Sequence, residues 1–105
     1  MEPVLFEYVT FTPVPGKRED YDLKLFALPT CGFCGRAKKW LKKKGFSYKI
    51  AYMDTLESTL KKRVKTDFQN AFGFPLTYPT LVIDGKDTLV GFIEIDWKQT
   101  LKSHR

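Results

Sequence analysis

The chain has 105 residues, of which 43% are hydrophobic and 15% aromatic, and its formal net charge at pH 7 is +6. This length and composition are typical of one globular domain and exclude a disordered chain. No apolar run approaches the roughly 20 residues that span a bilayer. The first residues include acids and lack the basic region of a signal peptide, so we expect no membrane association and a cytoplasmic protein.

The positive charge is concentrated in two lysine-rich runs, over residues 38–44 and 61–65. Both runs lie in segments whose apolar residues recur at helical spacing, where charged side chains fill the solvent-exposed face. No nucleic-acid-binding motif accompanies them. We therefore expect no nucleic-acid partner, and the charge can at most attract acidic proteins.

Hydrophobic periodicity and turn-forming residues predict strands and helices in alternation. In chain order the first elements are a strand over 4–11, a loop over 12–20, a strand over 22–28 ended by Pro29, a helix over 32–44 and a strand over 46–53. Gly45 is expected to end the helix. The helix residues expected to face the core are Cys34, Ala37, Trp40 and Leu41.

A second helix is predicted to begin at Asp54, with Glu57 completing a capping box, and to end at Gly73. The residues on its apolar face are Leu56, Leu60, Val64 and Phe68. The remaining elements are a loop over 74–79, a strand over 80–83, a hairpin turn at Asp84-Gly85, a strand over 88–92 and a helix over 94–102. We predict one α/β domain over 1–105, a mixed central sheet flanked by helices over 22–103, with an N-terminal strand and loop extension over 1–20.

The sequence holds two cysteines, Cys31 and Cys34, in the motif Cys31-Gly32-Phe33-Cys34 between a predicted strand and a predicted helix. This spacing lets the two sulfurs close a small ring. A helix start supplies unpaired N–H groups and the positive end of the helix dipole, which stabilise a thiolate. In a reducing compartment such a pair is more often catalytic or metal-binding than structural. The motif therefore predicts a redox-active dithiol.

Three landmarks within residues 22–103 resemble those of a glutaredoxin-like member of the thioredoxin-fold family. The first is the dithiol motif, and the second is Thr77-Tyr78-Pro79, similar to the Thr-Val-Pro segment that carries the family's cis-proline. The third is Val90-Gly91-Phe92, where glutaredoxins carry a Gly-Gly pair. The resemblance implies a thioredoxin-like fold and a thiol–disulfide oxidoreductase that reduces protein disulfides. In it, Cys31 is the nucleophile and Cys34 the resolving thiol.

The resemblance also implies a substrate-binding set, formed by Phe33, Thr77, Tyr78, Pro79 and Gly91. Pro79 is expected to be cis and to lie beside Cys31, so that the Tyr78 backbone can pair with an extended substrate. Phe33 is expected on the rim of the site as an apolar contact, with a position in the core as the alternative. Gly91 either lets a ligand or partner approach the backbone closely or ends a strand.

The chain departs from glutathione-using glutaredoxins at two anchor positions. Leu28 stands where they carry a lysine, and Phe92 and Ile93 follow Gly91 where they carry a small residue and an acid. A charge-assisted contact is worth about 1.5–3 kcal/mol, so these losses favour a flavoprotein reductase over glutathione as the reductant. The cations that could replace the missing lysine are Arg36, Lys38 and Lys65.

An alternative function follows from Gly32-Phe33, because the pair resembles the centre of the single-cysteine Cys-Gly-Phe-Ser class, which carries [2Fe–2S] clusters between two subunits. A cluster requires four ligands and this chain has two thiols, so such a carrier would need a dimer or glutathione. His104 is the single histidine, and we expect no mononuclear metal site. A partner-binding domain with incidental thiols is the third possibility. Our prediction is a monomeric reductase of disulfide-containing proteins with no bound cofactor.

Overall fold

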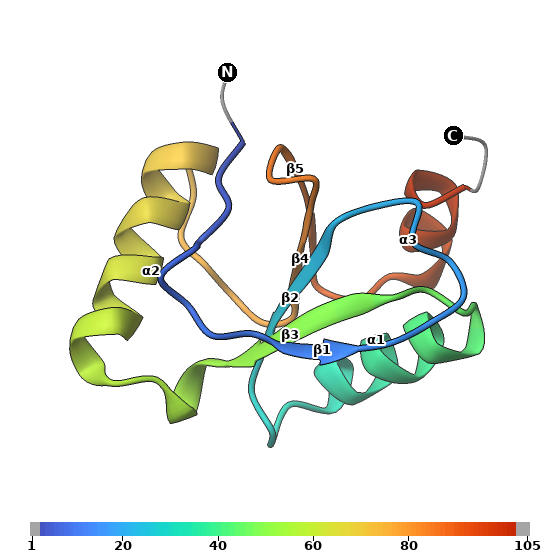
Figure 1. The fold of residues 1–105 in the computed structure, drawn as a ribbon, viewed down its shortest axis with the longest axis horizontal. Coiled ribbons are helices and arrows are strands. Elements are labelled where there is room, and N and C mark those ends of the chain that lie inside the picture. The colour runs from blue at the N-terminus through green and yellow to red at the C-terminus, as the bar shows by residue number, and fades with distance from the viewer. Residues whose placement is uncertain (1–2, 103–105) are drawn as a thin grey trace.

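The structure is a computed structural model that describes residues 3–102. Its strands are β1 (Thr12–Val14), β2 (Leu23–Ala27), β3 (Tyr48–Tyr52), β4 (Thr80–Ile83) and β5 (Asp87–Val90). Its α-helices are α1 (Gly32–Lys43), α2 (Ser58–Phe72) and α3 (Glu94–Thr100), and a short 3-10 helix covers Met53–Thr55. The five strands form one sheet in the order β1-β3-β2-β4-β5 (Figure 1). Only β2 and β3 are parallel neighbours; the other pairs are antiparallel. The predicted mixed α/β architecture is confirmed.

The helices cover the two faces of the sheet, and each face has its own buried cluster (Figure 1). Successive strand residues point to opposite faces. Leu25 of β2 therefore packs in one cluster with Trp97, while its neighbour Phe26 packs in the other with Phe68. The first cluster joins the sheet to α1 and α3, and the second joins it to α2 and the N-terminal segment. This arrangement places the start of α1 at one end of the sheet.

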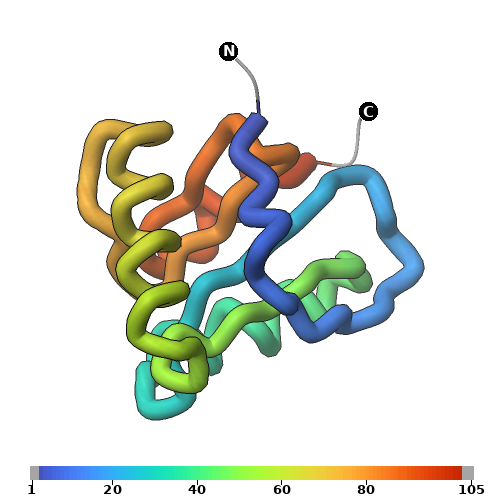
Figure 2. Tube along the Cα trace, turned by 60° about the vertical axis from the view of Figure 1, so that its left-hand side comes forward, coloured from blue at the N-terminus to red at the C-terminus, as the bar shows by residue number. Residues whose placement is uncertain are grey.

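The N-terminal prediction was wrong in its boundaries. Residues 4–11 contain a turn and no strand, and the added strand is β1, within the predicted loop. Phe6 and Val9 are 3% and 6% exposed and pack over the face covered by α2, a position that a continuous edge strand would not give them. β1 pairs antiparallel with β3 and covers that edge of the sheet. Figure 2 shows the segment running across the sheet toward β1.

The predicted start of the second α-helix was also wrong. Asp54 lies in the 3-10 helix, and Leu56 has extended backbone before α2 begins at Ser58. Glu57 is the N-cap residue but its side chain makes no capping hydrogen bond. Burial of Met53, which is 1% exposed, fixes a tight turn here that the capping-box pattern does not reveal.

Other predictions are confirmed to within a few residues. Gly73 ends α2 in the left-handed conformation, and Gly45 follows the end of α1 with φ +80°. Asp84 and Gly85 both have positive φ in the turn between β4 and β5, as the hairpin signal predicts. The strands are shorter than predicted where their ends bend into turns, as at Gly91, whose φ is +71°. Among the described residues, no helix is long and apolar enough to cross a bilayer.

Candidate active site

Cys31 is the N-cap residue of α1 and lies directly after the turn that follows β2. Its backbone is extended, with φ −87° and ψ 117°, and its N–H donates to the Leu28 carbonyl over 3.2 Å. This conformation turns the side chain back over the first helical turn. The Cys31 Sγ accepts a hydrogen bond from the Cys34 N–H over 3.2 Å. A backbone donor at the positive end of a helix is therefore aimed at this sulfur.

Cys34 lies one turn further along α1 in a different environment. It is 1% exposed and packs in the core cluster with Leu25 and Ala37, whereas Cys31 is partly exposed. Burial raises the pKa of the Cys34 thiol to about 11, with a further contribution from its hydrogen bond to Cys31. Both thiols are free. The pair thus consists of one accessible sulfur and one protonated thiol behind it.

The segment Thr77-Tyr78-Pro79 lies against this pair. The Tyr78–Pro79 peptide bond is cis, as predicted. The Cys31 thiol contacts the Tyr78 carbonyl oxygen at 3.9 Å, at the long limit of a hydrogen bond to sulfur. Thr77 is exposed, and its carbonyl accepts a hydrogen bond from the Thr80 hydroxyl over 2.7 Å. The backbone beside Cys31 is therefore held in place by contacts from both sides of the cis bond.

Gly91 forms backbone hydrogen bonds that hold the loop carrying Pro79 in place. Its N–H donates to the Pro79 carbonyl over 2.7 Å, and its own carbonyl accepts from the Trp97 indole N–H over 2.9 Å. A Cβ added at Gly91 would meet no atom within 4 Å, but φ is +71°. The left-handed backbone at the end of β5, rather than lack of space, accounts for the glycine here.

Phe33 lies on the surface beside the two cysteines, with 57% of its side chain exposed. The Arg36 guanidinium lies 5.8 Å from the centre of its ring. Gly32, Phe33 and Arg36 line a shallow cavity of about 350 Å³. Arg36 was not in the predicted substrate-binding set. Its separation of five residues from Cys31, about one and a half helical turns, is the sequence signal for it.

The positions that depart from glutathione-using relatives are apolar in the structure as well. Leu28 is partly buried against the cluster that contains Phe26. Phe92 packs on the rings of Trp40 and Trp97, and Ile93 is the N-cap residue of α3 without a side-chain capping bond. These positions therefore offer no charged or hydrogen-bonding side chain.

Three cations could replace the missing lysine. Of these, Lys38 donates a hydrogen bond to the Tyr52 hydroxyl. Lys65 is exposed on α2. Arg36, on the rim, is the one that lines a cavity beside the cysteine motif. Within residues 3–102, no three His, Cys, Asp or Glu side chains are placed to hold a metal ion. His104 lies outside the described residues.

The fold and the two cysteines define a thioredoxin-like domain with a dithiol at the start of its first helix. Residues 23–88 match the family model of the glutaredoxins, and the chain belongs to that family. Membership supports a role of the thiol–disulfide oxidoreductase kind.

Solved structures share the fold of this chain. A glutaredoxin from Methanosarcina mazei Go1 is 24% identical, with 88% of this chain and 87% of that chain covered and a TM-score of 0.76. A glutaredoxin from Archaeoglobus fulgidus is 24% identical over 84% of this chain and 100% of that one, with a TM-score of 0.68. Buckwheat glutaredoxin, solved as a complex with glutathione, is 26% identical over 78% of this chain and 71% of that one, with a TM-score of 0.60. A comparison with curated proteins gives no match to the chain.

Proposed function

We propose that this protein is a dithiol reductase of protein disulfides. The Cys31 thiolate attacks one sulfur of the substrate disulfide, a bond forms between Cys31 and that sulfur, and the other substrate sulfur leaves as a thiol after taking up a proton. Cys34 then loses its proton and attacks the Cys31 sulfur. The second substrate thiol is released and an internal Cys31–Cys34 disulfide remains. The substrate gains two electrons and two protons, one proton from Cys34 and one from solvent, and a reductant later returns two electrons and one proton to the protein.

The observation that carries this proposal is the 3.2 Å hydrogen bond from the Cys34 N–H to the Cys31 sulfur, combined with the contrast in exposure between the two thiols. The partly exposed thiol sits at the start of a helix, and the buried thiol lies within one helical turn of it. The Tyr78 backbone and the exposed Phe33 flank the accessible sulfur. We propose that they bind the substrate together with Thr77, Pro79 and Gly91.

We propose that a flavoprotein reductase regenerates the dithiol, because Leu28, Phe92 and Ile93 provide no polar anchor for glutathione. The buckwheat relative binds glutathione, so glutathione is the competing donor. The proposed compartment is the cytoplasm, where reductants keep a dithiol reduced. We further propose that the protein acts as a monomer without a bound cofactor.

Single cysteine variants test the mechanism. With a disulfide-containing protein such as insulin, Cys31→Ser is expected to abolish reduction. Cys34→Ser is expected to retain the first step and to accumulate a covalent mixed disulfide, visible by mass spectrometry of the intact protein and reversed by dithiothreitol. Full turnover by the Cys31→Ser protein would end this proposal. Matched assays with glutathione and with a thioredoxin reductase then identify the class of donor.

A further inference from the structure

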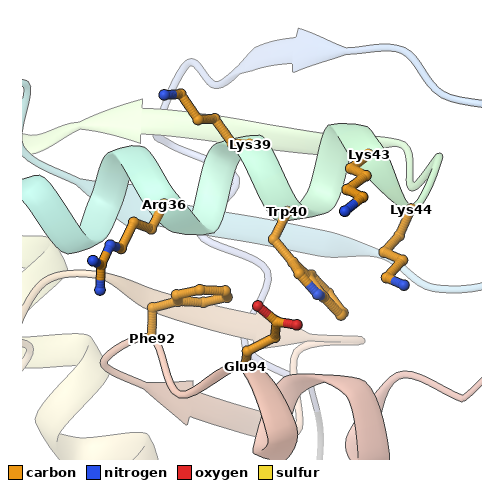
Figure 3. Close-up of a pocket in the computed structure, with 7 residues that line it drawn as sticks. All are labelled: Arg36, Lys39, Trp40, Lys43, Lys44, Phe92 and Glu94. Carbon is orange, nitrogen blue, oxygen red and sulfur yellow. The ribbon is translucent and has the colours of Figure 1, made fainter.

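A basic groove separates α1 from α3 on the face of the protein that they cover. It consists of two adjoining cavities of about 400 and 520 Å³, both lined by Trp40 and Lys44. Its base includes the aromatic rings of Phe46 and Phe92. Figure 3 shows the first of the two cavities, with α1 above it and the start of α3 below.

Cations dominate the rim of this basic groove. From α1, α3 and the residues just after them come Arg36, Lys39, Lys43, Lys44, Lys98 and Lys102. Arg18, which pairs with Asp20, also lines the second cavity. Among the described residues, Glu94 is the single acid that lines either cavity. Among residues 3–102, none of these six cations forms an ion pair. An apolar base with an unneutralised positive rim is complementary to a segment that carries both carboxylates and apolar side chains.

Trp40 gives a second and independent indication that the groove binds a ligand. Its side chain is 6% exposed, and no atom among the described residues accepts a hydrogen bond from its indole N–H. Buried donors in folded proteins nearly always have a partner, and an orphan one calls for a missing group. The indole reaches from α1 into the cavity that Glu94 enters from α3 (Figure 3). The other tryptophan, Trp97, has its N–H bonded to the Gly91 carbonyl.

The basic groove begins beside the redox pair. Arg36 lines both the groove and the shallow cavity that Gly32 and Phe33 form next to Cys31. From Arg36 to Lys44 the helix rises about 12 Å, which an extended peptide covers in about four residues. A polypeptide whose disulfide lies at Cys31 can therefore place its flanking residues along the groove.

We propose that the basic groove is a docking site for an acidic segment of the disulfide-containing substrate protein, adjacent to the disulfide that is reduced. This proposal rests on the proposed function and extends it to substrate selection. Carboxylates of the segment lie along the lysine rim, and one of them accepts the Trp40 indole N–H. An acidic peptide is favoured over a nucleic acid because the aromatic rings at the base are packed against one another, and so do not offer free faces on which bases could stack.

Peptide reduction kinetics test the docking site. Two peptides with the same disulfide are compared, one flanked on both sides by glutamates and the other by glutamines. We expect kcat/KM to be about fivefold higher for the glutamate peptide at low ionic strength, and this preference to disappear at 0.5 M salt. The double variant Lys39→Gln/Lys43→Gln is expected to remove most of the preference. The control, Lys61→Gln/Lys62→Gln on α2, has the same change in net charge and is expected to keep it.

Glu94→Gln gives a test in the opposite direction. Removal of this carboxylate from the lining of the groove is expected to raise kcat/KM for the glutamate peptide by about two- to threefold, with little change for the glutamine peptide. Many kinds of damage lower activity, so a variant that raises kcat/KM for one peptide is the more specific test. An unchanged or lower preference for the glutamate peptide in Glu94→Gln would contradict the docking site.

Binding without catalysis separates this proposal from the proposed function. The Cys31→Ser protein is titrated with a cysteine-free acidic peptide while the two indole N–H signals are followed by nitrogen–proton NMR. We expect the Trp40 signal to move and the Trp97 signal to stay. If the acidic peptide moves the Trp40 signal alone but the unaltered protein reduces no peptide, the docking site is supported and the proposed reductase function is wrong.

The proposal itself fails if both peptides are reduced equally well and the Trp40 signal does not respond to the acidic peptide. It also fails if a single-stranded oligonucleotide moves that signal at concentrations where the acidic peptide does not.

Discussion

At the scale of single residues, two side chains of the same type differ because of where one helix begins. Cys31 is half-buried and accepts a backbone hydrogen bond at the N-cap of α1, whereas Cys34 is buried one turn later. Burial raises the pKa of Cys34 to about 11, so at neutral pH this thiol is protonated. Only the thiolate attacks a disulfide. The resolving step is therefore expected to accelerate as the pH rises toward that value.

Alkylation of single-cysteine variants measures this difference. In Cys34→Ser the partly exposed Cys31 is expected to react with iodoacetamide faster at pH 7 than Cys34 does in Cys31→Ser. In Cys31→Ser, the remaining Cys34 is expected to react slowly, with a rate that rises about tenfold per pH unit between pH 7 and 9, because its thiolate fraction rises by that factor below the pKa. Mass spectrometry follows both reactions. Unfolding in urea should make the alkylation rates of the two variants equal. If the two rates are already equal at pH 7 in the folded proteins, the assigned environments of the two cysteines are wrong.

Gly91 permits a matched test of backbone conformation. Gly91→Ala places a Cβ where φ is +71° although no atom lies within 4 Å. The free energy of unfolding is expected to fall by about 1–2 kcal/mol, since left-handed backbone is unfavourable for L-residues. Gly35→Ala on α1 also adds a Cβ to open space but in a helix, and is expected to raise that free energy by about 0.5 kcal/mol. Urea denaturation measures both, and destabilisation of equal size in the two variants would refute this explanation.

At the scale of elements, the N-terminal segment acts as a strap across the sheet and as an added edge strand. Phe6 makes an edge-on contact with Phe26 at 5.1 Å between ring centres, and the Tyr8 hydroxyl donates to the Asp67 carboxylate on α2 over 2.7 Å. β1 then pairs with β3. The segment thus joins α2 to the sheet and covers a strand edge that would otherwise be free to pair with another chain.

Truncation of the strap's main apolar contact tests its contribution to stability. Phe6→Ala removes a ring that is 3% exposed, and the free energy of unfolding is expected to fall by about 3 kcal/mol. The neighbouring Leu5, which is 39% exposed, is the control, and Leu5→Ala is expected to change that free energy by less than about 0.5 kcal/mol. Chemical denaturation distinguishes the two. A strap that contributes little to stability would give the same small effect in both variants.

At the scale of the whole molecule, the two buried clusters differ in how they contact the cysteine pair. The cluster under α1 and α3 holds Cys34 and supports the loop that carries Pro79, through the hydrogen bond between Gly91 and Pro79. The cluster under α2 and the strap contains neither cysteine, although Leu28 and Tyr78, which lie next to Cys31, pack against it. Destabilising changes in the second cluster are therefore expected to lower the fraction of folded protein more than the activity per folded molecule.

The oligomeric state and the iron–sulfur alternative are tested together. We expect anaerobic incubation with iron, sulfide and glutathione to leave the desalted protein colourless and monomeric, because one chain supplies two thiols, one of them buried, and the glutathione anchors are replaced by apolar residues. Visible absorption and size-exclusion chromatography provide the measurements. A brown dimer would show that the cluster-binding alternative is correct and would weaken the case for a simple reductase.

The sequence by itself determined the order of elements from β2 to α3 and the candidate pair of cysteines. Its signals there are local: a strand ended by Pro29, apolar residues at helical spacing in α1, and the Asp84-Gly85 turn. Each depends on neighbouring residues alone, so each is readable without a tertiary structure. The cis bond before Pro79 was predicted only through the family resemblance, because most prolines are trans.

Tertiary structure decided the N-terminal boundaries, the start of α2 and the surroundings of the cysteines. Phe6 and Val9 look like strand residues in the sequence but pack on the sheet face, and burial of Met53 displaces the helix that Asp54 was expected to cap. The sequence does not reveal a role for the exposed Arg36 or for the unpaired Trp40 N–H, because Phe92 and Glu94, which line the same cavity, are distant in sequence. Contacts between segments distant in sequence set burial and hydrogen bonding, and these quantities decide which side chains can act.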